Sequence, residues 1–203
     1  MKYLIFSDVH GNLPALEAVL RDAGHVDGYI SLGDVVNYGP WSNECVQRVA
    51  ELNNCITIQG NHEEIFLTQD SSNCKPIATA FFEVCRKNFH QMETIRQYQK
   101  QKKFEKFILT HTIENRYIFA DTQVNLTSNY MITSNGFELY NPGSVGQNRK
   151  NLTDAQYLIY DTVLDSVEYK TTQYNAQAVI DVMKKLEYPS ICIEYYQSKL
   201  KGA

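Results

Sequence analysis

Short apolar runs alternate with helical patterns in the first third of the chain. Runs rich in apolar residues at 3–6, 29–32 and 55–58 have the length of strands, and the first is typical of a strand buried on both faces. Between them, apolar residues recur at helical spacing over 13–20 and 44–52. The order strand, helix, strand, helix, strand predicts parallel β-α-β units.

The second half predicts antiparallel strands instead. Apolar runs at 107–113 and 116–120 flank the two-residue turn Glu114-Asn115. Because parallel strands need a crossover of about a dozen residues, a link this short predicts a hairpin. Two further pairs are expected, at 130–133 with 137–140 and at 156–161 with 166–171.

Helical patterns account for most of the remaining chain. They extend over 77–101, 175–186 and 190–200. The lysine-rich stretch 100–106 is interpreted as the solvated end of a helix that precedes a strand. Since no repeat or low-complexity linker interrupts the pattern, we expect a single α/β domain over residues 1–203, parallel in its first half and antiparallel in its second.

Composition excludes several classes of protein. Of the 203 residues, 43% are hydrophobic and 21% charged, which is typical of a globular chain with a sizeable core. No apolar run approaches the roughly 20 residues that span a bilayer, and residues 1–6 fit a strand better than a signal peptide. The formal net charge of −4 does not suit a duplex-DNA binder. Five cysteines without C-x-x-C spacing indicate packed thiols in a reducing compartment, so we expect a cytoplasmic protein with no membrane partner.

A polar cluster follows each of the three predicted parallel strands. The clusters are Asp8-Val9-His10, Gly33-Asp34 and Gly60-Asn61-His62-Glu63. Each is ordinary by itself, since a lone Asp-x-His or Gly-Asp occurs in many turns. Because ligands bind beyond the carboxyl ends of parallel strands, three clusters in this order predict one shared site. Its carboxylate, imidazole and carboxamide groups suit Mn, Fe or Zn.

Four segments of the chain resemble the calcineurin-like metallophosphoesterases, in particular their compact bacterial branch. They are the three segments Ser7–Leu13, Gly33–Pro40 and Gly60–Glu63, and the later run Asn141–Gln147. The tail from Ala155 also resembles this branch, whereas the stretch from about residue 70 to residue 135 does so only weakly. The resemblance implies a four-layer αββα sandwich that holds two divalent metal ions.

The resemblance also implies roles for particular residues. Asp34 would bridge the metal ions, with Asp8 and His10 on one ion and Asn61 on the other. His62 would act as general acid or transition-state stabiliser while a metal-bound hydroxide attacks the phosphate ester. Substrate contacts are expected from Asn12 and from Tyr38, whose loop is equally well interpreted as stacking on a nucleobase or as a rigid surface turn.

The chain departs from the family pattern in its later part. Relatives have a further His in a His-Gly turn and two more in a Gly-His-x-His turn, but this chain has five histidines and no His-x-His. Two alignments compete. In one, His111 supplies a surviving ligand; in the other, Asp121 takes the place of that histidine, with Gln123 as a weak further substitute. The predicted hairpin favours Asp121, and His25 and His90 are expected to be ordinary polar residues.

Two functions are compatible with these observations. The five intact residues Asp8, His10, Asp34, Asn61 and His62 favour an enzyme that hydrolyses a small phosphate ester, nucleotides included. The missing His-x-His favours a scaffold that kept the fold and lost turnover. We expect the enzyme, with one or two divalent ions in each chain.

Overall fold

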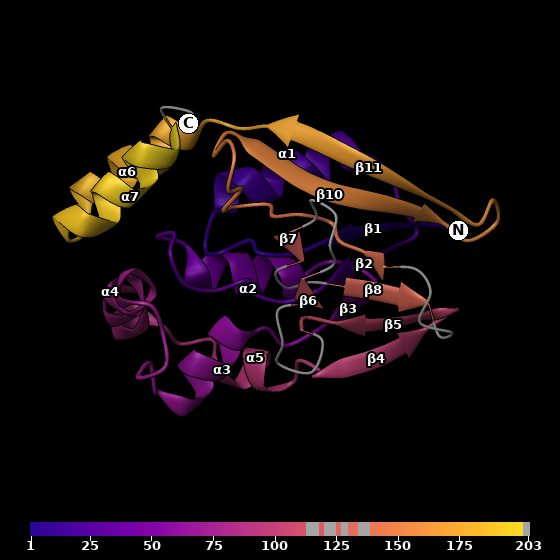
Figure 1. The fold of residues 1–203 in the computed structure, drawn as a ribbon, viewed down its shortest axis with the longest axis horizontal. Coiled ribbons are helices and arrows are strands. Elements are labelled where there is room, and N and C mark those ends of the chain that lie inside the picture. The colour runs from indigo at the N-terminus through magenta and orange to yellow at the C-terminus, as the bar shows by residue number, and fades with distance from the viewer. Residues whose placement is uncertain (113–117, 120–124, 127–129, 134–138, 201–203) are drawn as a thin grey trace.

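The structure is a computed structural model, and it describes residues 1–112, 118–119, 125–126, 130–133 and 139–200. A five-stranded sheet forms its centre, in the order β11 (Ser166–Gln173), β10 (Asp154–Asp161), β1 (Lys2–Phe6), β2 (Gly28–Ser31) and β3 (Cys55–Thr57). The strands β1, β2 and β3 are parallel, whereas β10 is antiparallel to both of its neighbours. The predicted change from parallel to antiparallel pairing is therefore confirmed (Figure 1).

A second sheet is antiparallel throughout. Its order is β4 (Gln101–Phe104), β5 (Phe107–Thr110), β8 (Tyr130–Thr133) and β9 (Leu139–Tyr140), and a separate short ladder joins β6 (Ile118–Phe119) to β7 (Asn125–Leu126). The expected pairing of 130–133 with 137–140 is found as β8 with β9.

The turn predicted at Glu114-Asn115 lies outside the described residues, and the described strands on its two sides do not pair with each other as expected. The strand β5 pairs with β4 on one edge and with β8 on the other, whereas β6 pairs with β7. The hairpin turn of β5 comes earlier, at Glu105-Lys106, where Glu105 has the left-handed φ of 50° that such a tight hairpin uses. Residues Gln101–Phe104 of the lysine-rich stretch therefore form strand β4 and not the end of a helix. Alternate residues of this strand face solvent.

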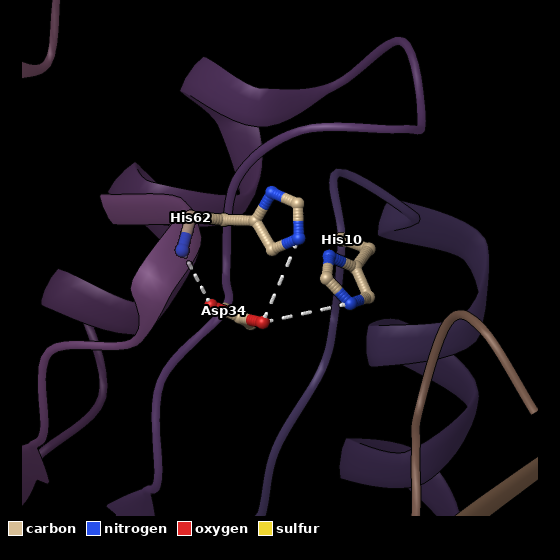
Figure 2. A group of neighbouring side chains, drawn as sticks. All are labelled: His10, Asp34 and His62. Atoms are coloured by element: carbon tan, nitrogen blue, oxygen red, sulfur yellow. Dashed lines mark hydrogen bonds and ion pairs between the residues drawn. The ribbon is translucent and has the colours of Figure 1, made fainter. Parts of the chain in front are cut away.

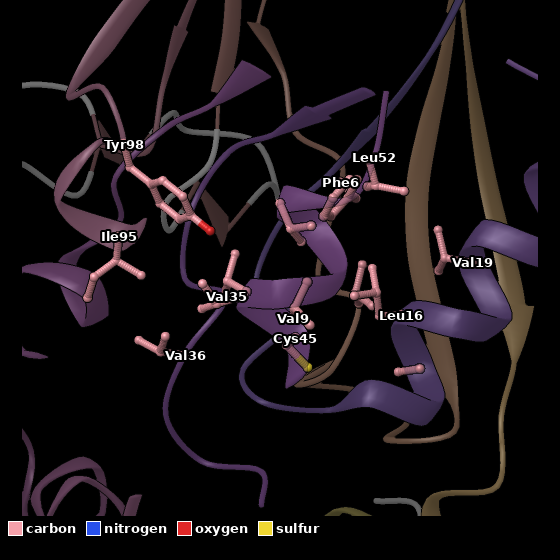
Figure 3. Packing of buried hydrophobic residues seen from close by; sticks show 14 of the residues in the cluster. Phe6, Val9, Leu16, Val19, Val35, Val36, Cys45, Leu52, Ile95 and Tyr98 are labelled. Atoms are coloured by element: carbon pink, nitrogen blue, oxygen red, sulfur yellow. The ribbon is translucent and has the colours of Figure 1, made fainter. Parts of the chain in front are cut away.

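Helices cover one face of the five-stranded sheet. The helices α1 (Leu13–Ala23) and α2 (Ser42–Ala50) belong to this layer, together with α3 (Asn61–Thr68), α4 (Pro76–Cys85) and α5 (Met92–Arg96). A short 3-10 turn, η1 (Arg86–Asn88), separates α4 from α5, so the helix expected over 77–101 is broken. Figure 3 shows the core between helices and sheet, where Phe6, Val9 and Leu16 are fully buried.

The second sheet covers the other face. Ile5, Ile30 and Leu158 of the central sheet pack against Phe107 and Leu109 of β5. The predicted mixed α/β class is confirmed, and these clusters account for three layers of the expected four-layer αββα sandwich: a helical layer, a five-stranded sheet and a four-stranded sheet. A third cluster joins α4 to α6 (Ala176–Lys185) and α7 (Ser190–Leu200) at one end of the sheet. No helix in the described part of the chain has both the length and the apolar character needed to cross a bilayer.

Candidate metal centre

Three loops meet at the carboxyl edge of the parallel strands, as the order of the polar clusters predicts. Backbone hydrogen bonds hold the loops together beyond the strands: Asp8 N–H donates to Gly33 O at 3.0 Å, and His10 N–H donates to Asp34 O at 2.9 Å. The third loop, after β3, begins helix α3, whose His62 N–H donates to Asp34 Oδ1 at 2.9 Å. The side chains after all three strands therefore share one small region.

The backbone at this edge is held in an unusual conformation. Asp8, His10 and Asp34 have φ angles of 51°, 49° and 55°, in the left-handed region that residues with a Cβ rarely adopt. Asn37 and Tyr38 in the loop after Asp34 are also left-handed, with φ of 73° and 62°. Such strain costs on the order of 1–3 kcal/mol for each residue, and it clusters at functional sites.

Gly60 allows the closest approach of two loops. A Cβ at this position would lie 2.2 Å from Asp34 Oδ1, so any other residue would displace the carboxylate. The glycine before Asn61 is thus required by the position of Asp34, and not only by the turn that it makes.

Asp34 lies at the centre of three imidazoles. Its Oδ2 atom is 3.3 Å from His111 Nε2, 3.8 Å from His10 Nε2 and 3.9 Å from His62 Nε2. Figure 2 shows His10 and His62 pointing at this carboxylate from two different segments of the chain. One possible ligand atom from each of His10, Asp34 and His62 lies within 4.8 Å of the other two. All four side chains are buried.

Backbone carbonyls fix the orientation of two of these imidazoles. His111 Nδ1 lies 2.7 Å from Leu32 O, and His10 Nδ1 lies 3.3 Å from Val36 O. Because a carbonyl only accepts, each ring carries a proton on Nδ1 and can present a lone pair on Nε2 toward Asp34 once that nitrogen is deprotonated. Metal-ligating histidines are typically held in this way.

Asp8 and Asn61 supply oxygen atoms on either side of Asp34. Asp8 Oδ1 is 3.2 Å from His10 Nε2, whereas Asp8 Oδ2 is buried without a hydrogen-bond partner. Asn61 Oδ1 is 3.1 Å from His111 Nε2. An unpartnered buried carboxylate oxygen is costly unless a cation binds it. The donor set therefore fits divalent metal ions that accept mixed nitrogen and oxygen ligands.

The charges of the cluster move the pKa values of its members in opposite directions. Burial raises the pKa of Asp34, but His111 and His62 outweigh burial and hold this pKa well below its usual range. Burial lowers the pKa of His111, yet the Asp34 carboxylate dominates and raises it to about 10. Burial lowers the pKa of His62 to about 4 despite the attraction of Asp34. Without a cation, His111 carries the compensating charge and His62 is neutral at pH 7.

Glu63 is a residue of this site whose role was not predicted. Its fully buried carboxylate accepts four backbone N–H groups, from Asp34 (2.8 Å), Val35 (2.7 Å), Val36 (3.2 Å) and Gly60 (2.7 Å). Glu63 therefore ties the loop after β2 to the start of α3. Its position three residues after the N-cap Gly60 is the sequence signal that could have indicated this bond, since a Glu there often reaches back to the N-cap N–H.

Asn37 is a second residue that the sequence did not single out. Its Nδ2 lies 2.9 Å from His62 Nδ1 and also donates to Ala78 O at 3.4 Å. An amide nitrogen only donates, so His62 Nδ1 accepts and the ring proton is on Nε2. The loop after Asp34 thus sets the tautomer of His62.

Of the two alternative ligands, the structure describes only His111. His111 directly follows β5 and lies against Asp34 and Asn61, because β5 is the second strand of its hairpin and ends at the site. Asp121 and Gln123 lie outside the described residues. His25 and His90 are exposed, which fits the expectation of ordinary polar residues.

The two predicted substrate contacts differ. Asn12 is fully buried: its Oδ1 caps helix α1 at Ala15 N (3.2 Å), and its Nδ2 donates to Gly146 O (3.1 Å) and Tyr174 Oη (2.9 Å). Both amide protons of Asn12 are therefore used within the protein, and its contact with a substrate stays a prediction. Tyr38 is half-buried, and its ring contacts His10 and His62 at centroid distances of 4.8 and 5.3 Å.

A polar pocket lies beside Asn61 and His111. Its other lining residues come from the start of α3, from the segment before β4 and from the end of β5: Gln59, Gly60, Glu64, Lys100 and Thr112. Lys100 Nζ is 3.9 Å from Glu64 Oε1, and both side chains are mostly exposed. The centre is therefore open to small polar molecules on this side.

Comparisons with known proteins find relatives that match this chain over most of its length. The family model described as calcineurin-like phosphoesterase matches residues 1–179. The uncharacterized protein MJ0912 of Methanocaldococcus jannaschii is 26% identical over 226 aligned residues, covering 91% of this chain and 93% of that protein. A metallophosphoesterase from Sphaerobacter thermophilus is 25% identical with a TM-score of 0.75, covering 98% of this chain and 100% of that one. The hypothetical protein PH1004 from Pyrococcus horikoshii OT3 shares the fold with a TM-score of 0.78 at 16% identity, over 96% and 97% of the two chains.

The chain belongs to the calcineurin-like phosphoesterase family, because the family model spans most of its length and includes every residue of the centre described above.

Proposed function

We propose that this protein is a metal-dependent phosphoesterase that hydrolyses a phosphomonoester or a phosphodiester. The observation that carries the proposal is the single buried carboxylate oxygen of Asp34, which lies within 4 Å of the Nε2 atoms of His10, His62 and His111. A carboxylate shared in this way can serve two cations at once. The residues that would hold one ion are Asp8, His10 and Asp34, and those that would hold the other are Asp34, Asn61 and His111.

A divalent cation at this site supplies Lewis acidity toward a phosphoryl oxygen and lowers the pKa of a water molecule toward neutrality. Mn, Fe and Zn all suit the mixed imidazole, carboxylate and amide donors. The carbonyl groups of Leu32 and Val36 support this use of His111 and His10, because they hold the Nδ1 protons and leave Nε2 for the cation.

His62 acts as a hydrogen-bond donor to the substrate. Its pKa of about 4 makes it neutral at pH 7, and Asn37 places its proton on Nε2, the atom that faces Asp34. A neutral imidazole in this position stabilises charge on a phosphoryl or leaving-group oxygen. Of the two expected roles for His62, general acid or transition-state stabiliser, this favours the stabiliser, whose proton moves only as the leaving oxygen gains charge.

A small phosphate ester fits the surroundings of the centre. The polar pocket beside Asn61 and His111 includes the exposed Lys100, which suits an anionic substrate. On the other side Tyr38 forms an aromatic wall against His10 and His62, which suits a planar group such as a nucleobase.

The test combines metal analysis with hydrolysis of bis-p-nitrophenyl phosphate in Mn²⁺. Asp34→Asn keeps the shape of the side chain and removes its charge, so we expect loss of bound metal and a fall in kcat/KM of more than 100-fold. Loss of a residue that only supports a metal ligand already lowers affinity or activity about 10–100-fold. The matched control is Asp181→Asn on the outer side of α6, where only Gln177 Nε2 contacts the carboxylate. A wild-type protein that binds no metal and hydrolyses no faster than Asp34→Asn would overturn the proposal.

A catalytically inactive scaffold is the second candidate function. It is favoured by the histidine count, because only His10, His62 and His111 reach the centre among the described residues and the chain has two others, His25 and His90. This candidate predicts metal binding without turnover. Stoichiometric metal in the wild type, together with no hydrolysis of mono- or diester substrates, would favour the scaffold over the enzyme.

A further inference from the structure

The loop between β9 and β10 is fastened directly to the metal centre. Gly146 N–H and Ser144 Oγ both donate to Asp8 O, at 2.8 and 3.2 Å. A Cβ on Gly146 would lie 1.9 Å from Val9 O, so the loop can approach this closely only with glycine there. Gln147 N–H donates to Ser144 Oγ at 2.8 Å, which fixes the next residue beside the centre as well.

The C-terminal helix α7 brings a lysine onto this loop. Lys199 Nζ donates to Gln147 Oε1 at 3.0 Å and lies 4.6 Å from the ring centroid of Tyr195. The Tyr195 ring is 5.9 Å from that of Tyr38, which in turn contacts His10. An unbroken series of contacts thus leads from the metal centre to Lys199, and helix α7 lies at the C-terminal end of the chain in Figure 1.

One buried hydrogen-bond donor in this region, Gln147 Nε2, has no acceptor. Because Lys199 holds Gln147 Oε1, the amide is oriented with Nε2 away from the lysine, and this Nε2 is buried without a hydrogen-bond partner. A buried unmatched donor costs about 1–3 kcal/mol. In a metal centre of this kind, an oxygen-rich ligand is the natural acceptor.

Positive charge accumulates at the same place. Burial and the charge of Arg149 lower the pKa of Lys199 to about 8 against the opposing effect of Asp8, so Lys199 lies within electrostatic reach of both Arg149 and Asp8. Within the described part of the chain, no carboxylate forms an ion pair with Lys199 or Arg149. Two neighbouring cations that lack a counter-ion repel one another, and a bound anion would relieve this repulsion.

We propose that Lys199, Arg149 and Gln147 form a subsite for a second phosphate group of the substrate, beside the metal centre and on its Tyr38 side. The inference rests on the proposed function and specifies its substrate class: phosphate esters that carry a further phosphate, such as nucleoside diphosphates. The first phosphate would lie at the metal centre, the second would accept hydrogen bonds from the three donors, and Tyr38 with Tyr195 would line the space between them.

The test compares ADP with AMP as inhibitors of bis-p-nitrophenyl phosphate hydrolysis, with free Mn²⁺ held constant by buffering. We expect ADP to inhibit at lower concentration than AMP. Lys199→Met keeps the aliphatic stem over Tyr195 and should raise the inhibition constant of ADP about 10-fold, as loss of one charge-assisted hydrogen bond implies, while that of AMP changes less than twofold. Lys199→Arg should restore ADP inhibition. Lys184→Met, in the last turn of α6, is the matched control.

The failure of this inference is distinguishable from that of the proposed function. If the wild type hydrolyses the diester but Lys199→Met weakens AMP and ADP equally or neither, the subsite is wrong and the phosphoesterase proposal stands. If the wild type hydrolyses nothing, calorimetric titration of ADP and AMP into the Mn²⁺-loaded protein decides the subsite by itself. A loss of ADP affinity confined to Lys199→Met supports it, and equal affinities for wild type and variant overturn it.

Discussion

Glu63→Gln tests whether one buried carboxylate holds the site together. In the wild type, Oε1 accepts N–H groups from Val35 and Val36, and Oε2 accepts those of Asp34 and Gly60. Glutamine keeps the volume but replaces one oxygen by an NH₂ group. The two backbone N–H groups that pointed at the replaced oxygen then face the NH₂ group, which cannot accept a hydrogen bond. Both of their charge-assisted hydrogen bonds are lost.

The size of the effect follows from these four bonds. Two buried donors left unmatched cost about 2–6 kcal/mol in total. Removing a buried charge returns part of this, because burial raises the pKa of Glu63 and so opposes its ionised form. We expect the free energy of unfolding to fall by about 3 kcal/mol, which moves the urea midpoint by about 1 M or more if the slope is unchanged.

The assay is urea unfolding of the metal-free protein, followed by Mn²⁺ titration. Glu64→Gln is the matched control. The Glu64 carboxylate is mostly exposed, and the substitution removes a contact of 3.9 Å between Glu64 Oε1 and Lys100 Nζ. This control should stay within about 0.5 kcal/mol of the wild type. Metal affinity should also fall in Glu63→Gln, because the loop that carries Asp34 is no longer fixed. A loss below about 1 kcal/mol would refute the reasoning that the four N–H bonds depend on the ionised carboxylate.

Three further predictions concern the histidines. His111→Ala should reduce Mn²⁺ affinity by more than 100-fold, because loss of a residue that merely supports a metal ligand already costs about 10–100-fold. The exposed His90→Ala should leave the affinity unchanged. Equal Mn²⁺ affinities of wild type and His111→Ala in calorimetry would exclude His111 as a ligand. Asn37→Asp should raise the pKa of His62, because a carboxylate in place of the amide would stabilise a second ring proton, on Nδ1, and the acidic limb of the pH–rate profile should move upward; an unmoved limb would contradict the contact between residue 37 and His62. In the metal-free protein, the pKa of His111 is raised from 6.5 to about 10, so its charge stabilises the fold fully below about pH 6.5 and less as the pH rises toward 10. The stability difference between wild type and His111→Gln should therefore shrink from pH 6 to pH 10, and a constant difference in urea unfolding would show that His111 is not protonated.

Local patterns were sufficient for most of the architecture. The runs at 3–6, 29–32 and 55–58 are strands because they are short and apolar, and they are parallel because helices of adequate length separate them. The convergence of Asp8, His10, Asp34 and Asn61 followed from the same rule, because the carboxyl ends of parallel strands meet at one edge.

The second sheet shows where local patterns were misleading. The turn Glu105-Lys106 carries charged residues that also suit a helix end, while Glu114-Asn115 looks like a hairpin turn. Which strands pair is decided by contacts between residues distant in sequence, here of β5 with β8, and these contacts leave no local signature. The expected hairpin had favoured Asp121 over His111, the histidine that the structure places against Asp34.

The sequence by itself determined the class of the fold, the edge of the sheet that holds the site and the ligands that come directly after strands. Only the tertiary structure decided that His111 lies against Asp34, that Glu63 gathers four N–H groups, and that Lys199 reaches Gln147 across 52 residues of chain. The physical reason is that a short-range pattern indicates which residues of a segment are buried. A site depends instead on which side chains from separate segments of the chain lie next to one another.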